Sequence, residues 1–81
     1  MTLNEAFARR VKEFLKEKKM TQYQLCQETG LYPSTIHYII HAKTNASNFK
    51  SMALIIRALG VSVSEFFASP VYNFDNLEIE G

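Results

Sequence analysis

Residues 21–40 read TQYQLCQETGLYPSTIHYII, and this stretch decides the fold. Thr21 and Gln24 form a capping-box pair, which predicts a helix that begins at Gln22. Gly30 supplies a left-handed stop for that helix, and Pro33 suits the first position of another, where no amide hydrogen is needed. Two short helices joined by a turn at residues 30–32 have the spacing of a helix-turn-helix.

The second of these helices has an apolar side and a polar side. Its inward positions are the isoleucines Ile36, Ile39 and Ile40. Its outward positions carry hydroxyl, imidazole and phenol groups: Ser34, Thr35, His37, Tyr38 and His41. No acidic residue occurs in this helix or in the polar loop that follows it, residues 43–48. Such a composition suits a surface that meets phosphate groups.

Three further helices are predicted around this motif. The first covers about residues 3–19, with a capping box at Thr2 and Glu5 and with Leu3 on its apolar face. Another covers about residues 49–59 with Phe49 turned inward, and a last short helix runs from a cap near residue 62 to Pro70. No strand alternation competes, so the predicted fold class is all-α, with five helices and no internal repeat.

Charge is distributed unevenly along the 81 residues. Residues 1–50 carry a net charge of +4 and residues 51–81 one of −3, within a total of +1. This asymmetry favours a polyanionic partner for the first fifty residues, while a solvated helix face is the alternative explanation.

Other classes of function lack support in the sequence. There is no apolar run long enough to span a membrane and no secretory signal, so with the lone Cys26 we expect a cytoplasmic protein. No nucleophile, base or phosphate loop has the spacing of an enzyme, so catalysis is not predicted. His37 and His41 are four residues apart, a spacing that metal ligands can have, but no third ligand accompanies them. We therefore predict neither metal nor cofactor.

A family resemblance joins these features. Met20-Thr21-Gln22-Tyr23-Gln24-Leu25, Gly30, Pro33-Ser34-Thr35-Ile36 and Ala58-Leu59-Gly60-Val61-Ser62 resemble the lambda-repressor/Cro-like (Xre) family of regulators. The resemblance implies a helix-turn-helix DNA-binding domain over residues 1–68, followed by a C-terminal tail over residues 69–81. It also implies an operator in double-stranded DNA and a homodimer that binds two half-sites.

The resemblance also assigns site residues. Those that match base-reading positions are Pro33, Ser34 and Tyr38. Those that match positions near the DNA backbone are Gln22, Tyr32, Thr35, His41, Lys43 and Asn45. Tyr38 can present its hydroxyl to a base or a phosphate, or its ring to a thymine methyl group.

Several positions depart from the family pattern. Pro33 and Ser34 stand where long bidentate side chains are common, which shifts the expected specificity toward DNA shape and apolar contacts. Leu15 and Ile40 replace a charged pair between two helices with an apolar contact. Ala42 replaces a glycine after the recognition helix, so we expect that helix to run slightly longer.

Two functions follow as hypotheses. The first is a sequence-specific DNA-binding transcriptional regulator, in particular a repressor. The alternative is a protein-interaction module, such as a toxin-neutralising antitoxin or an adaptor that does not bind DNA, with the apolar and acidic tail as its docking segment. The tail itself has three possible fates: packing on the domain, dimerisation or mobility.

Overall fold

A computed structural model describes residues 1–43 and 48–79. Within these ranges five α-helices follow one another: α1 (Leu3–Glu17), α2 (Gln22–Thr29), α3 (Pro33–Ile40), α4 (Phe49–Ala58) and α5 (Val63–Phe67). Two short 3₁₀ turns come next, η1 (Pro70–Tyr72) and η2 (Phe74–Asn76). The predicted all-α fold with five helices is confirmed.

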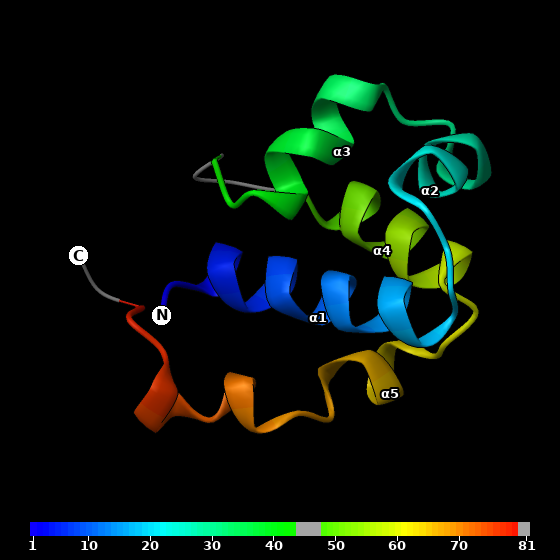
Figure 1. The fold of residues 1–81 in the computed structure, drawn as a ribbon. Coiled ribbons are helices and arrows are strands. Elements are labelled where there is room, and N and C mark those ends of the chain that lie inside the picture. Colours follow the sequence, from blue (N-terminus) through cyan, green and yellow to red (C-terminus); the bar gives the residue numbers. More distant parts are fainter. Residues whose placement is uncertain (44–47, 80–81) are drawn as a thin grey trace.

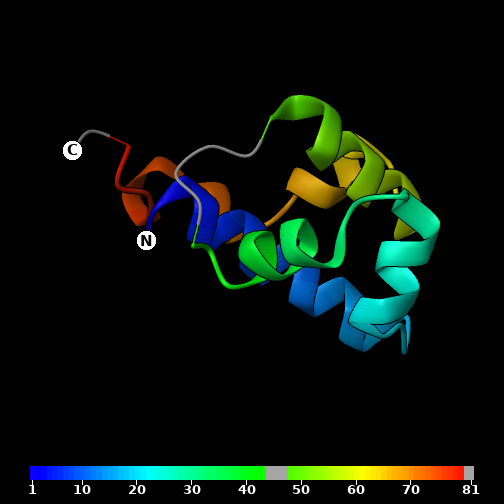
Figure 2. The same ribbon diagram turned by 90° about the horizontal axis from the view of Figure 1, so that it is seen from above.

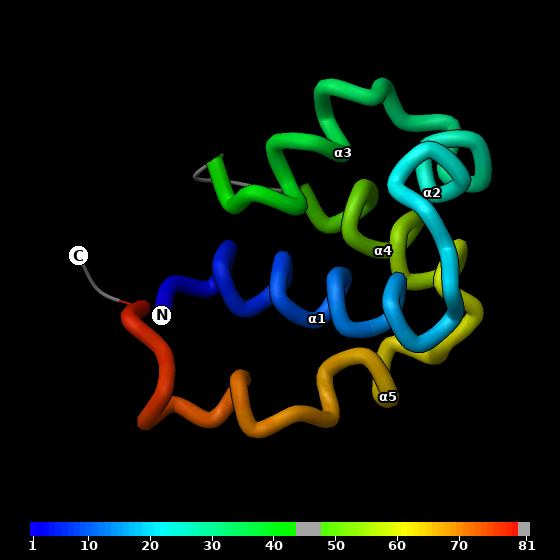
Figure 3. The backbone as a smooth tube through the Cα atoms, in the orientation of Figure 1, coloured from blue at the N-terminus to red at the C-terminus, as the bar shows by residue number. Residues whose placement is uncertain are grey.

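The arrangement has α1 at its centre. Figure 1 shows α2 and α3 on one side of α1, and α5 with the C-terminal turns on the other. Seen from above, α3 crosses over α1 while α2 lies at the far end of the molecule (Figure 2). The backbone trace in Figure 3 shows the sharp reversal that connects α2 to α3. The outer side of α3 is therefore left uncovered by the other helices.

The core forms where these helices meet. Phe66 of α5 is fully buried, and its ring centroid lies 5.0 Å from that of Phe7 and 5.8 Å from that of Phe14. Ile40 of α3 belongs to the same buried cluster, and Leu15 of α1 packs against it. Both residues that replace the charged pair therefore take part in this apolar cluster. Cys26 is only partly buried and also packs against this cluster.

Two residues expected inside are exposed. Leu3 is 49% exposed and Phe49 is 72% exposed, although both continue the apolar face of their helix. Each is the first residue of its helix, α1 or α4, and the buried residues of those helices begin only at Ala6 and Ser51. Helical spacing predicts the face correctly but cannot say where along the helix that cover begins.

Helix ends also differ from expectation in two places. The first helix stops at Glu17 because Lys19 adopts a left-handed φ of 53°. The expectation that α3 would run longer is wrong: it ends at Ile40, and Ala42 takes a φ of 53°. In that conformation the Cβ of an L residue crowds the following carbonyl oxygen. Ala42 therefore makes this turn at a cost in free energy that glycine, which has no Cβ, avoids.

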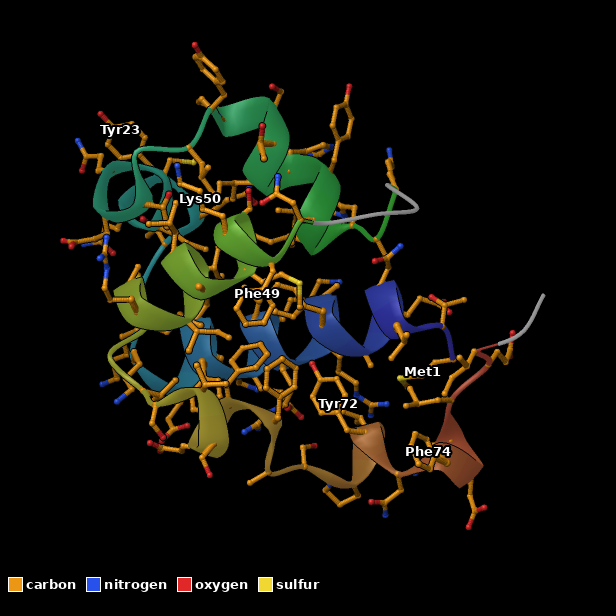
Figure 4. All side chains as sticks on the ribbon, turned by 180° about the vertical axis from the view of Figure 1, so that it is seen from behind. Met1, Tyr23, Phe49, Lys50, Tyr72 and Phe74 are labelled. Atoms are coloured by element: carbon orange, nitrogen blue, oxygen red, sulfur yellow. The ribbon has the colours of Figure 1, made fainter. Side chains whose placement is uncertain are left out.

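The C-terminal segment folds back on the domain. η1 packs against α1, and the Tyr72 ring lies edge-on to Phe67 at 4.8 Å. Further on, the Glu78 amide donates to the Met1 carbonyl at 2.7 Å, and Thr2 and Glu78 form an isolated parallel bridge. Figure 4 shows Tyr72 extending toward α1 while Phe74 lies on the outer side of the segment.

Candidate nucleic-acid interface

A capping box stabilises the start of α2. The Thr21 hydroxyl accepts from the Gln24 amide at 3.1 Å, and the Gln24 side chain accepts from the Thr21 amide at 2.8 Å. Gln22 is the first helical residue and is partly buried. The amides of a first turn point out of the helix end with a partial positive charge, an arrangement that suits a phosphate oxygen.

A buried threonine closes the turn between the two helices. The Thr29 hydroxyl donates to the Leu25 carbonyl at 2.8 Å and accepts from the Leu31 amide at 3.2 Å. Gly30 has a φ of 73°, a left-handed conformation that favours glycine, and its amide donates to the Cys26 carbonyl at 2.9 Å. These bonds hold α3 at a fixed angle to α2.

The first turn of α3 is exposed. Tyr32 occupies the N-cap position with a side chain that is 78% exposed and makes no capping hydrogen bond. Pro33 and Ser34 follow and are also exposed, whereas Thr35 is partly buried. The Tyr32 side chain therefore remains available for contacts other than capping its own helix.

Three rings line the outer side of α3. Tyr38 is 51% exposed, and its ring meets that of His37 at 5.9 Å with an interplanar angle of 66°. His37 in turn lies 4.3 Å from the His41 ring. The row of rings formed by Tyr38, His37 and His41 faces solvent along the last turn of α3 and its C-cap.

A positive cluster lies at the end of this row. Partial desolvation lowers the pKa of His41 below its ordinary value, and the charges of His37, Lys12 and Lys43 lower it further. The electrostatic effect of Lys12 on His41 shows that a basic residue of α1 lies near the end of α3. Lys12 thus adds a positive charge near the end of α3.

The structure brings together many of the residues that the sequence proposed. Ser34, Tyr38 and His41 share the exposed side of α3, with Tyr32 at its start and Lys43 beyond its end. Gln22 is the first residue of the neighbouring helix α2. Asn45 lies outside the described residues.

Sequence reasoning placed His37 on the outward side of its helix but did not count it among the site residues. In the structure His37 stands between Tyr38 and His41 in the row of rings. Lys12 was missed, since its approach to His41 depends on how α1 packs against α3.

The described residues offer little to other chemistries. Within residues 1–43 and 48–79, no three histidine, cysteine or acidic side chains gather into a possible metal site. Over the same ranges, none of the helices has the length and apolar character needed to cross a membrane.

Comparison with known proteins agrees with the geometry. The wild-type restriction-modification controller protein C.Esp1396I superposes with a TM-score of 0.75 and is 31% identical, covering 83% of this chain and 87% of that chain. A tyrosine-to-alanine mutant of the same protein gives a TM-score of 0.75 at 31% identity, covering 83% of this chain and 86% of its own. No curated protein sequence matches the chain significantly.

A family model supplies the assignment. The model of the Cro/C1-type HTH DNA-binding domain matches residues 10–70, which run from within α1 to the first residue of η1. This is a family of DNA-binding regulators and not of enzymes. The resemblance inferred from residues 20–25, 30, 33–36 and 58–62 is confirmed, and the chain belongs to the Cro/C1-type HTH DNA-binding domain family.

Proposed function

We propose that the protein is a transcriptional repressor that inserts α3 into the major groove of a specific operator. One observation carries the proposal: the outer side of α3 is exposed, free of acidic residues and backed by a rigid turn. A helix with such a surface can enter the groove, where its first residues and long side chains meet base edges. Ser34 and Tyr38, with Pro33 beside them, are the proposed base-reading residues.

Phosphate contacts flank the reading helix in this proposal. Gln22 binds a phosphate from the start of α2, and Tyr32 and Thr35 bind near the start of α3. His41, Lys43 and Asn45 approach the backbone beyond its end, joined by Lys12 from α1, whose charge acts on His41. Such contacts fix register and supply affinity, while base contacts supply specificity.

The proposed assembly is a homodimer on two half-sites about one helical turn apart. α5 supports this proposal, because Val63 at its start is 50% exposed on a helix that does not take part in the reading surface. The C-terminal segment beyond α5 extends the proposed interface. Repression then follows from occupation of a promoter in the cytoplasm. The similarity to a restriction-modification controller protein supports a regulatory role.

A salt titration of operator affinity tests the phosphate contacts. Each phosphate neutralised steepens the slope of log K against log salt by about 0.9. We expect Lys12→Gln with Lys43→Gln to flatten the slope by about 1.8, since two contacts are lost. Arg57→Gln serves as the control because this exposed arginine lies in the last turn of α4. An unchanged slope in the double variant contradicts the assignment.

A protein-interaction module is the second candidate, and the C-terminal segment favours it. Phe74 is 81% exposed and Ile79 is 54% exposed, among the acidic residues Asp75 and Glu78. Exposed apolar side chains in such a segment can dock a protein partner. Binding to a partner through this segment would respond weakly to salt, whereas operator binding weakens steeply.

A further inference from the structure

The outer side of α3 lacks the side chains that usually read bases by paired hydrogen bonds. Residues 33–40 read PSTIHYII and contain no arginine, lysine, asparagine, glutamine or acidic residue. Bidentate recognition of guanine, adenine or cytosine edges depends on those side chains. What α3 offers instead is a serine hydroxyl and a row of rings.

The Tyr38 ring contacts a neighbouring ring before any DNA arrives. It is 51% exposed, so about half of its surface is free, and its edge contacts the His37 ring with the two centroids 5.9 Å apart. His37 is itself packed at 4.3 Å against His41. A side chain that already packs against a neighbouring ring has less conformational entropy to lose on binding. A small apolar contact then contributes more of its free energy to affinity.

The major groove offers one apolar group to such a ring, the 5-methyl group of thymine. We infer that Tyr38 determines specificity by packing its ring on that methyl group, and that the operator carries a thymine at the matching position of each half-site. This inference rests on the proposed function and specifies the base feature that α3 reads. The Tyr38 hydroxyl is the competing explanation for any effect of this residue.

Deoxyuridine substitution isolates the methyl group. The full-length protein is titrated against its selected operator, with each thymine replaced in turn by deoxyuridine, which lacks only the methyl. One thymine per half-site should weaken binding about fourfold, the contribution of one buried methyl-sized group. Tyr38→Phe keeps the ring and should keep this loss. Tyr38→Ala removes the ring and should bind thymine and deoxyuridine operators equally.

Varying both the thymine and residue 38 separates a contact between Tyr38 and the methyl group from an effect of the methyl group on DNA shape. Only the contact depends on Tyr38. Tyr23→Ala is the matched control, because Tyr23 is a 68% exposed tyrosine on α2. It should retain the fourfold loss.

The contrary outcomes are distinct. Equal affinity for all deoxyuridine operators, or a loss that persists in Tyr38→Ala, overturns the inference while leaving the regulator itself intact. A loss of sensitivity in Tyr38→Phe assigns the effect to the hydroxyl and also overturns it. Absence of any selected operator contradicts the proposed function.

Discussion

Replacing Arg10 by alanine should destabilise the fold more than any other removal of a single charge. Arg10 lies in α1, and its Nε donates to the Phe66 carbonyl at 2.7 Å while a terminal nitrogen donates to the Glu65 carbonyl at 2.9 Å. The guanidinium also lies 4.4 Å from the centre of the Phe14 ring and pairs with Glu13 at 3.2 Å. One side chain thus ties α1 to the carboxyl end of α5.

The magnitude follows from these contacts. A hydrogen bond from a charged donor contributes about 1.5–3 kcal/mol, and a cation–π contact contributes about 0.5–1 kcal/mol. The exposed pair with Glu13 adds less than about 1 kcal/mol. The Glu65 bond is exposed, so water replaces part of it. We therefore expect a loss of about 2–4 kcal/mol, against a total stability of about 4–12 kcal/mol for a domain of this length.

Urea denaturation followed by circular dichroism measures this loss directly. The midpoint should fall with an unchanged m-value, and the melting temperature should drop by about 10–20 °C. Arg9→Ala is the control, because Arg9 is the exposed neighbour and should cost no more than about 0.5 kcal/mol. A loss in Arg10→Ala below about 1 kcal/mol would refute this account of how α1 and α5 are joined.

Three further predictions concern single positions. Ala42→Gly should stabilise the protein by about 1 kcal/mol, because glycine relieves the left-handed φ of 53°, and a lower urea midpoint would contradict this. Tyr72→Phe should leave stability unchanged or raise it by about 1 kcal/mol, since the buried hydroxyl has no hydrogen-bond partner in the described residues. A clear loss in a thermal melt would reveal a partner for that hydroxyl. Operator affinity should rise as the pH falls below 6.5, the ordinary pKa of histidine, because the lowered pKa keeps His41 neutral until then and protonation adds a positive charge near phosphate. His41→Gln should flatten that pH profile, and a flat wild-type profile between pH 5.5 and about 8 would exclude the effect.

Local chemistry made most of the helix starts predictable. The capping boxes at Thr2 and Thr21 are both formed, and each begins its helix at the expected residue. Ser62 likewise accepts the Glu65 amide at the start of α5. Gly30 and Pro33 mark the turn because their backbone preferences hold wherever they occur. These signals depend on neighbours in sequence alone.

Tertiary packing determines the features that sequence patterns could not predict: the exposure of single residues and the contacts between distant segments. Phe49 continues an apolar face yet stays exposed, because it is the first residue of α4 and the buried residues of that helix begin at Ser51. The C-terminal segment has no helical periodicity, so its return to α1 through Tyr72 depends on contacts far apart in sequence. The role of Arg10 was equally hidden, since its acceptors are more than fifty residues away. Lys12 reaches His41 only through the packing of α1 against α3.

Selection of binding sites from a random duplex library tests the central claim most directly, that the outer side of α3 reads DNA sequence. The wild-type protein should recover one palindromic motif, and the Ser34→Ala, Tyr38→Ala double variant should lose or relax it. The control variant Tyr23→Ala removes an exposed tyrosine from α2, outside α3, and should recover the wild-type motif. Recovery of an unchanged motif by the α3 variant, or no enrichment by the wild-type protein, would contradict the claim.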